Sequence, residues 1–217
     1  MNKKKVYGIF DTETVGLHKK YIYDIGLVIT RKGEEPCYMN DWAVGEMIHN
    51  PLIKEAKFFV PRDYEKRRII SWKQIREEFN YQLHKHSVDV LVAYNMSFDV
   101  EAIRQTTKIL LNRETFLTKK VEYFDLWLAS CLSFMQQKQY KDWAPKSKAG
   151  NTRTNAETAF RFLQRYEEGE QYIHQHTALD DAITEERILQ NVLRQKKKII
   201  KNQFVAHPWR LVQEEAG

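Results

Sequence analysis

The fold is decided by the stretch Val6-Tyr7-Gly8-Ile9-Phe10-Asp11-Thr12-Glu13, a short apolar run that ends in two acidic residues. Such a run is typical of a buried central strand. Because side chains alternate between the two sides of a strand, the pattern predicts that Asp11 and Glu13 project in the same direction. The alternative is a solvated strand end, the common situation of acidic residues that are considered singly.

Two more strands are predicted directly after the first one. Residues 25–29 form a second apolar run, which Arg31-Lys32-Gly33 closes, and residues 37–44 alternate between apolar and polar side chains. Strands that follow one another this closely, with turns between them, indicate an antiparallel meander rather than strand–helix–strand units.

The rest of the chain alternates between helix and strand patterns. Residues 50–86 have a helical texture, and Ser71 is expected to cap a helix whose apolar residues recur at three- and four-residue spacing. Residues 136–152, rich in Gln, Lys, Ser, Gly and Asn, predict a loop. Further strands are expected at residues 88–93 and 121–124, and helices from about residue 98, from 125, over 155–166, and from 177 to about 193. Together these patterns predict an α/β fold with a mixed sheet flanked by helices.

Length and composition bound the class of protein. A chain of 217 residues is long enough for one substantial core, so we expect one catalytic domain over residues 1–195 and a basic C-terminal extension over residues 196–217. The net charge of +6 suits a polyanionic partner. No apolar stretch approaches the roughly 20 residues of a membrane helix, and no signal-peptide pattern is present, which predicts a cytoplasmic protein without a membrane partner. Cys37 and Cys131 lie far apart in the sequence, so we expect buried reduced thiols rather than a disulfide or a zinc cluster.

Two other places in the chain put acidic residues next to a predicted helix start. Asp99 falls in the first turn of the helix that follows the strand at 88–93, at the edge where sites form in α/β sheets. Its alternative role is to satisfy free amides at the helix N-terminus. His176 precedes a helix that carries Asp180 and Asp181, which are about 100° apart around its axis, so at most one of the two faces any given site. His176 alone is more often an exposed loop histidine than a base.

Acidic side chains that converge on one sheet edge repel each other, so they must take up protons or bind cations. Ligands that are all oxygen favour Mg²⁺ or Mn²⁺. Two such ions can hold the attacking and leaving oxygens of a phosphodiester, and a nearby neutral histidine is suited to take a proton from water.

Three segments of the sequence resemble, in order, the motifs of the DEDD 3'-5' exonucleases of the His-containing (DEDDh) subgroup, which includes the proofreading subunit of bacterial DNA polymerase III and RNase T. The first is Phe10-Asp11-Thr12-Glu13-Thr14-Val15-Gly16-Leu17, and the second is Val92-Ala93-Tyr94-Asn95-Met96-Ser97-Phe98-Asp99. The third is the H-x4-D from His176 to Asp181, whose spacing selects Asp181 over Asp180. The resemblance extends over residues 6 to about 193.

The resemblance implies an RNase H-like fold with a five-stranded mixed sheet, and release of nucleoside 5'-monophosphates from a 3' end. It implies that two Mg²⁺ or Mn²⁺ ions are held by carboxylates and that His176 activates the water. The implied metal ligands are Asp11, Glu13, Asp99 and Asp181. The residues implied to meet the substrate are Thr14, Gly16, Leu17, Asn95 and Phe98.

The expected substrate is the 3' end of single-stranded DNA, with a DNA polymerase or replication assembly as the expected partner. RNA or oligoribonucleotides are the near alternative, because RNA and DNA differ at the 2'-hydroxyl and the three motifs are shared by enzymes that act on either. A non-catalytic nucleic-acid-binding module is the alternative from another class. Two features depart from the family: Asp24 stands where many relatives have Glu, and residues 36–68 form a longer and more aromatic segment. The lysines at 146–151 and 196–201 predict solvated charged surface, with phosphate contact as the alternative for the first group.

Overall fold

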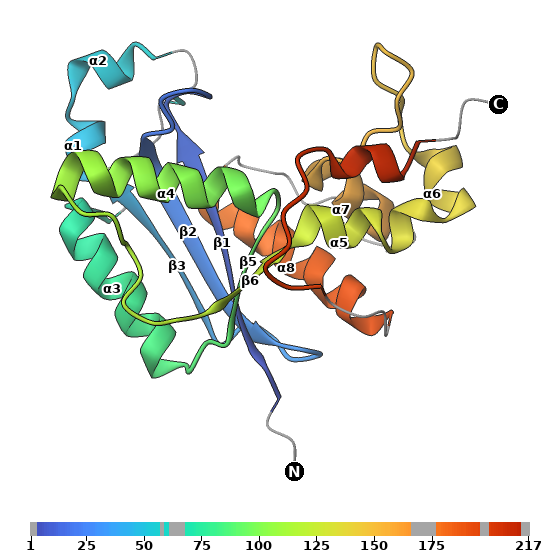
Figure 1. The fold of residues 1–217 in the computed structure, drawn as a ribbon, viewed down its shortest axis with the longest axis horizontal. Coiled ribbons are helices and arrows are strands. Elements are labelled where there is room, and N and C mark those ends of the chain that lie inside the picture. The colour runs from blue at the N-terminus through green and yellow to red at the C-terminus, as the bar shows by residue number, and fades with distance from the viewer. Residues whose placement is uncertain (1–3, 57–58, 61–67, 166–176, 196–199, 214–217) are drawn as a thin grey trace.

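A computed structural model of the protein describes residues 4–56, 59–60, 68–165, 177–195 and 200–213. Its centre is a mixed sheet (Figure 1). This sheet has six strands in the order β4-β3-β2-β1-β5-β6. The strands are β1 Val6–Thr14, β2 Ile22–Arg31, β3 Tyr38–Val44, β4 Ile69–Ile70, β5 Val90–Ala93 and β6 Glu122–Asp125. The predicted α/β class with a mixed sheet is confirmed. The sheet has one strand more than the five expected, because the two-residue β4 adds to its edge through backbone pairing with β3.

The antiparallel meander predicted for the first 45 residues is present. β1 pairs antiparallel with β2, and β2 pairs antiparallel with β3, while β1–β5, β5–β6 and β3–β4 are parallel pairs. β1 is longer than its apolar run, since pairing with β2 continues past Asp11 to Thr14. In this register Asp11 lies opposite Gly26, and Glu13 lies opposite Asp24. Both acidic residues therefore lie on a part of β1 that is paired with β2 and not on a frayed end.

Helices cover both faces of the sheet (Figure 1). α3 (Trp72–Lys85) and α4 (Met96–Leu111) pack on one face, over a core that includes Phe10, Trp42 and Phe79. α5 (Leu126–Cys131), α7 (Ala156–Gln164) and α8 (Ala178–Arg194) pack on the other face, over a core that includes Ile9 and Val92. Ile9 and Phe10 point to opposite cores, as alternation along a central strand requires. Two short helices, α1 (Gly45–Ile48) and α2 (Pro51–Lys54), follow β3.

Local capping signals place several helix starts as predicted. Ser71 caps α3 in a capping box with Gln74, Asp125 accepts a hydrogen bond from the Leu128 amide at the start of α5, and Thr177 accepts one from the Asp180 amide at the start of α8. α4 begins at Met96, about two residues before the expected start, because Asn95 takes the left-handed conformation (φ 70°) and turns the chain sharply out of β5.

The stretch expected to be a loop at residues 136–152 is partly helical. A 3₁₀ turn, η2 (Phe134–Gln136), and the helix α6 (Lys138–Trp143) form there. Tyr140 on α6 is fully buried, with its ring 4.9 Å from that of Phe162 on α7. This long-range aromatic contact orders a segment whose local composition favours a loop.

The described part of the predicted C-terminal extension packs on the domain. η3 (Pro208–Leu211) lies beside α5, and Val212 is fully buried in the core beneath α5, α7 and α8. The Asn202 side chain accepts a hydrogen bond from the Tyr123 amide at 2.9 Å, which joins this segment to β6. Lys196, Lys197, Lys198 and Ile199 lie outside the described residues.

Both cysteines are free thiols, but only Cys131 is buried as expected. Cys37 is exposed, since it lies in the β2–β3 connection just before β3 begins. None of the helices in the described part of the chain has the length and apolar character needed to cross a membrane.

Candidate active site

Acidic side chains from β1, α4 and α8 meet at one edge of the sheet. Asp11 interacts electrostatically with Asp99, Glu185, Asp181 and Glu13. Burial, followed by these four negative neighbours, raises the pKa of Asp11 well above its ordinary value. The structure therefore brings together the four carboxylates singled out in the sequence and adds a fifth. We call this group the acidic cluster; its members are Asp11, Glu13, Asp99, Asp181 and Glu185.

Asp99 is held in a defined position beside β1. It is 2% exposed, and its Oδ1 accepts a hydrogen bond of 2.7 Å from the Thr12 hydroxyl. Burial raises the pKa of Asp99 to about 7, although the hydrogen bond from Thr12 acts in the opposite direction. The Thr12 hydroxyl thus joins β1, which carries Asp11 and Glu13, to α4, which carries Asp99.

The fifth carboxylate, Glu185, was missed in the sequence. It is 2% exposed on α8, four residues after Asp181, and its Oε2 accepts a hydrogen bond of 3.1 Å from the Tyr94 amide at the end of β5. Burial raises the pKa of Glu185 well above its ordinary value, and Asp99 and Asp181 add to the effect. The signal that could have found it is its i+4 spacing from Asp181, which puts both residues on one face of the helix.

The start of α8 lies directly against β2 because residue 26 is glycine. A Cβ at Gly26 would meet the carbonyl group of Ala178 at 2.5 Å, which is backbone and cannot rotate away. The buried carboxylate of Asp24 also reaches this helix start, since its Oδ2 lies 3.4 Å from the Ala178 amide. Gly26 is the residue of β2 that pairs with Asp11 on β1. The close approach of α8 to β2 therefore sets the distance between Asp11 and the acidic residues of α8.

The two aspartates at the start of α8 have different surroundings. The Asp180 amide donates to the Thr177 hydroxyl at 3.0 Å, and that hydroxyl donates to Asp180 Oδ2 at 2.6 Å. Asp181 instead interacts with Asp11 and Glu185. Asp180 therefore takes part in the capping of α8, while Asp181 is directed to the acidic cluster. His176 lies outside the described residues.

The residues implied to meet the substrate surround this edge. Leu17 is 60% exposed in the β1–β2 connection, and the Phe98 ring lies under the Lys20 ammonium at 4.4 Å. Thr14 is buried, and its hydroxyl donates to the Gly16 carbonyl at 3.3 Å. Asn95 is half-buried at the turn into α4 and accepts a hydrogen bond from the Ser97 hydroxyl. A Cβ at Gly16 would make only ordinary contact with the protein, at 3.5 Å from the Lys19 carbonyl oxygen, so the fold itself does not require glycine there.

The donor set fits hard divalent cations. The cluster consists of carboxylates alone, and their mutual repulsion and burial favour either protons or positive ions. Within the described residues, no three His, Cys, Asp or Glu side chains are arranged so that they could hold a metal ion.

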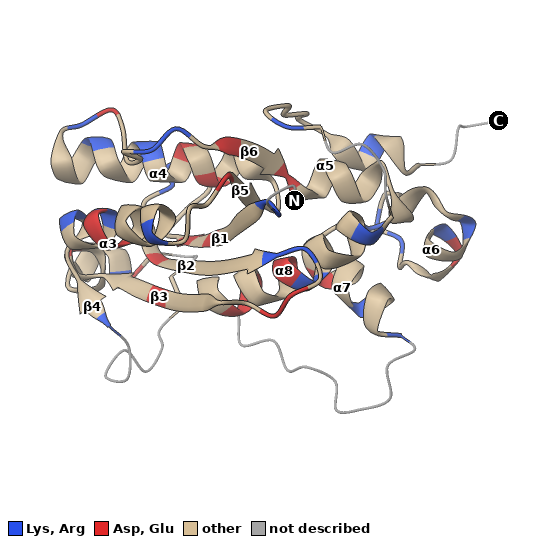
Figure 2. Ribbon diagram, turned by 90° about the horizontal axis from the view of Figure 1, so that it is seen from below, with Lys and Arg blue, Asp and Glu red and all other residues tan. Residues whose placement is uncertain are grey.

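Among the described residues, the lysine and arginine side chains do not gather on one face of the protein that would indicate where nucleic acid binds. Figure 2 shows Lys and Arg distributed over many elements of both helical layers, with acidic residues among them. Several of these lysines and arginines are paired, as in Arg68–Glu78 and Arg104–Glu101.

The fold is shared with solved exonuclease structures. Exonuclease I of E. coli in complex with a dA16 oligonucleotide matches with a TM-score of 0.55 and 14% identity, over 89% of this chain and 41% of that chain. The zinc-bound complex of the same enzyme with ssDNA matches with a TM-score of 0.56 and 13% identity, over the same 89% and 41%. The cell-death related nuclease 4 (CRN-4) matches with a TM-score of 0.61 and 15% identity, over 92% of this chain and 67% of that chain.

This chain spans less than half the length of the Exonuclease I chains. A comparison with models of protein families finds no match, and a comparison with curated protein sequences finds none either. At identities of this level, the likeness establishes the fold.

Proposed function

We propose that this protein is a metal-dependent 3'-to-5' exonuclease that removes nucleoside 5'-monophosphates from single-stranded nucleic acid. The observation that carries the proposal is the meeting of Asp11, Asp99, Asp181 and Glu185 at the edge of an exonuclease-like sheet. Carboxylates that are buried or half-buried and repel one another are costly to a fold, and a site for positive ions is a physical reason to keep them.

We assign the metal-binding role to Asp11, Glu13, Asp99 and Asp181. When bound, two Mg²⁺ or Mn²⁺ ions would supply positive charge to the phosphodiester oxygens and acidify a bound water. The H-x4-D spacing to Asp181 supports His176 as the group that takes the proton from that water, as in the DEDDh subgroup. Thr12 keeps the Asp99 carboxylate directed to the cluster through its 2.7 Å hydrogen bond.

Leu17 and Phe98 are the apolar side chains of this edge that we assign to the terminal nucleotide. The exposure of Leu17 supports contact with a base, and the Lys20 ammonium above Phe98 is suited to a nearby phosphate. We assign Thr14, Gly16 and Asn95 to further contacts with the same terminal nucleotide.

Single-stranded DNA is the substrate that we favour, with RNA as the alternative. In the E. coli Exonuclease I structures the bound molecules are a dA16 oligonucleotide and ssDNA, which supports the choice of DNA by analogy. We further propose that the protein acts alone or as the proofreading partner of a DNA polymerase.

The test is a side-by-side digestion of single-stranded DNA, duplex DNA, RNA and dinucleotides with Mg²⁺ or Mn²⁺, in which the products are identified by mass. Release of 5'-mononucleotides, fastest from single-stranded DNA, is the expected result. Internal cleavage, or no cleavage with either metal, would reject the exonuclease assignment, whereas preference for RNA would change only the substrate.

A further inference from the structure

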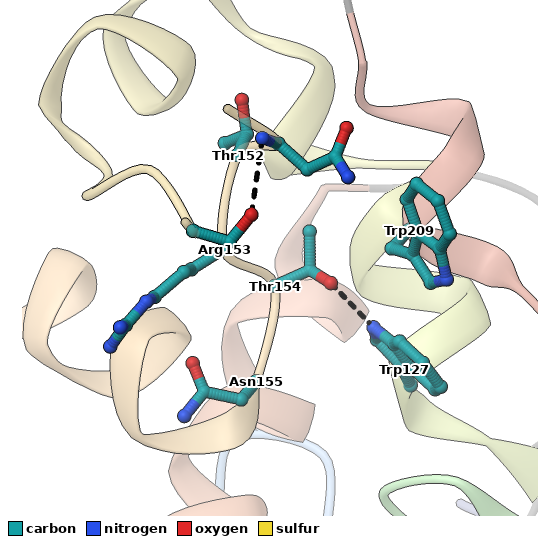
Figure 3. Close-up of a pocket in the computed structure, with 8 residues that line it drawn as sticks. Trp127, Thr152, Arg153, Thr154, Asn155 and Trp209 are labelled. Atoms are coloured by element: carbon teal, nitrogen blue, oxygen red, sulfur yellow. Dashed lines mark hydrogen bonds between the residues drawn. The ribbon is translucent and has the colours of Figure 1, made fainter. Parts of the chain in front are cut away.

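A pocket of about 380 Å³ lies between the start of α5, the 146–155 segment and η3 (Figure 3). Its size is at the small end of the roughly 300 to 1,000 Å³ typical of small-molecule sites. Figure 3 shows Trp127 and Trp209 on one side of the pocket, and the chain from Thr152 to Asn155 on the other. Both indoles are half-exposed, so their rings are accessible to a ligand.

The pocket is connected to the acidic cluster through Tyr94. The Tyr94 ring stacks on Trp127, with centroids 6.3 Å apart and planes 22° apart, and its hydroxyl donates to the Thr154 carbonyl. The amide of the same residue donates to Glu185 in the cluster. Trp127 follows Asp125, the residue that pairs with Ala93 at the ends of β5 and β6. The pocket therefore lies at the same carboxyl edge of the sheet as the proposed active site.

The walls of the pocket are held in place by hydrogen bonds. The Trp127 indole N–H donates to the Thr154 hydroxyl at 2.9 Å, as Figure 3 shows. A tight hairpin at 146–152, with Gly150 at φ 79°, is closed by the Lys146 ammonium, which donates to the Thr152 hydroxyl at 2.8 Å. Gln213 accepts from the Thr152 amide at 2.7 Å and donates to the Trp209 carbonyl at 2.7 Å. These contacts join η3 to the hairpin, so the two tryptophans are pre-positioned.

The charge around the pocket favours a polyanion. The residues that line it include Arg153 and no acidic residue. Arg153 is exposed and has no acidic partner among the described residues. Lys148 and Arg210, which neighbour lining residues in the sequence, are also exposed. Exposed cations beside accessible aromatic rings are the combination with which proteins bind single-stranded nucleic acids.

We propose that this pocket binds an unpaired base of a single-stranded nucleic acid, stacked on Trp209 and Trp127, with the adjoining phosphates near Arg210, whose guanidinium lies 5.6 Å from the centre of the Trp209 ring. The site deepens the proposed function and rests on it, because the occupant would be the same strand whose 3' end reaches the acidic cluster. Stacking suits every base, so the pocket would add affinity without sequence preference.

The test compares Trp209→Leu with Trp143→Leu, an exposed tryptophan that does not line the pocket, by anisotropy with a labelled oligothymidylate of about 12 nucleotides in Ca²⁺. We expect binding by Trp209→Leu to weaken about 5- to 100-fold, Trp209→Phe to recover most of it, and Trp143→Leu to match the wild type. An oligomer of the same length with abasic residues should bind the wild type at least as weakly as the oligothymidylate binds Trp209→Leu, because it also loses the base contacts assigned to Trp127, Leu17 and Phe98. Equal binding of both oligomers by the wild type would mean that phosphates alone are recognised, and would overturn the proposal.

Measurements of cleavage distinguish the proposed pocket from the proposed exonuclease function on which it rests. A dinucleotide is too short to reach both the acidic cluster and the pocket, so its hydrolysis should be unchanged in Trp209→Leu. The KM for the oligothymidylate of about 12 nucleotides should rise in the same variant. Loss of both activities together, or of neither, would contradict a separate base-binding pocket. If the wild type binds the oligothymidylate but cleaves no nucleic acid, the proposed function fails, and the anisotropy series still decides whether the pocket exists.

Discussion

At the scale of single residues, the carboxylates of the acidic cluster lower the stability of the metal-free protein, although we expect catalysis to need them. Asp99 is buried beside Asp11, and its pKa is raised to about 7 mainly because burial disfavours the charged form. A proton or a cation relieves this cost. Asp99 is thus unfavourable for the folded chain without metal, yet it is a residue that we expect to be needed for catalysis.

Asp99→Asn is therefore expected to abolish exonuclease activity and to stabilise the metal-free protein. Its amide oxygen can still accept the hydrogen bond from Thr12, while the buried charge is removed. Thermal unfolding in EDTA at about pH 8 should show a melting temperature several degrees above that of the wild type. An unchanged or lower melting temperature would mean that the carboxylate carries no such cost.

The pair Asp180 and Asp181 gives a matched test of the same helix turn. Asp181→Asn should lower turnover by at least about 100-fold, since Asp181 interacts with Asp11 and Glu185. Asp180→Asn should retain most activity and lose at most about 1 kcal/mol of stability, because Asp180 takes part in the capping of α8. Equal loss of activity in both variants would show that the assignment of Asp181 is wrong. Steady-state rates on a single-stranded oligonucleotide, with circular dichroism as a folding control, make the comparison.

At the scale of elements, the site depends on how closely α8 approaches β2. The Ala178 carbonyl would be 2.5 Å from a Cβ at position 26, so only glycine permits this approach. Helix α8 carries both Asp181 and Glu185, and β2 pairs Gly26 with Asp11 on β1. A displacement of the helix start would separate the carboxylates of α8 from that of Asp11.

Gly26→Ala is expected to lower activity by about 100-fold and to destabilise the fold by roughly 1–3 kcal/mol, the usual cost of overpacking. Gly8→Ala is the control on the same sheet, because the three atoms nearest to a Cβ there would be side-chain methyl groups, at 3.2, 3.3 and 3.6 Å. Denaturant unfolding and oligonucleotide digestion of both variants test this. Full activity in Gly26→Ala would show that the approach of α8 to β2 does not set the site.

Short-range signals explain which elements could be predicted from the sequence. Ser71, Asp125 and Thr177 cap helices through contacts within three residues, and the alternation in β1 placed Asp11 and Glu13. The features that were missed depend on contacts far apart in the chain. Glu185 meets the amide of a residue 91 positions away, and α6 forms around the packing of Tyr140 on Phe162.

At the scale of the whole molecule, the cluster links stability to pH and to divalent cations. The pKa of Asp99 is about 7 in the folded state and about 3.9 for an unfolded aspartate, so the folded chain holds its proton more tightly. A raised acid pKa contributes stability that is present at about pH 4 and is lost as the pH rises through about 7. The pKa shifts of Asp11 and Glu185 are in the same direction.

The melting temperature of the metal-free protein should therefore fall between about pH 5 and pH 8, more steeply than that of Asp99→Asn. Mn²⁺ should raise it more at about pH 8 than at pH 5, because protons and cations compete for the same carboxylates. Differential scanning fluorimetry in EDTA and in Mn²⁺ measures both effects. A Mn²⁺ stabilisation independent of pH, or retained in Asp11→Asn, would place the bound ion elsewhere.

We propose that these carboxylates form the active site of a 3'-to-5' exonuclease. The decisive experiment is the digestion of a 5'-labelled single-stranded oligonucleotide in Mn²⁺, with wild type and Asp11→Asn purified in the same way. We expect a ladder of products that shorten one nucleotide at a time from the 3' end with the wild type, and none with Asp11→Asn. The same ladder from both proteins, or release of the labelled 5' nucleotide first, would contradict it.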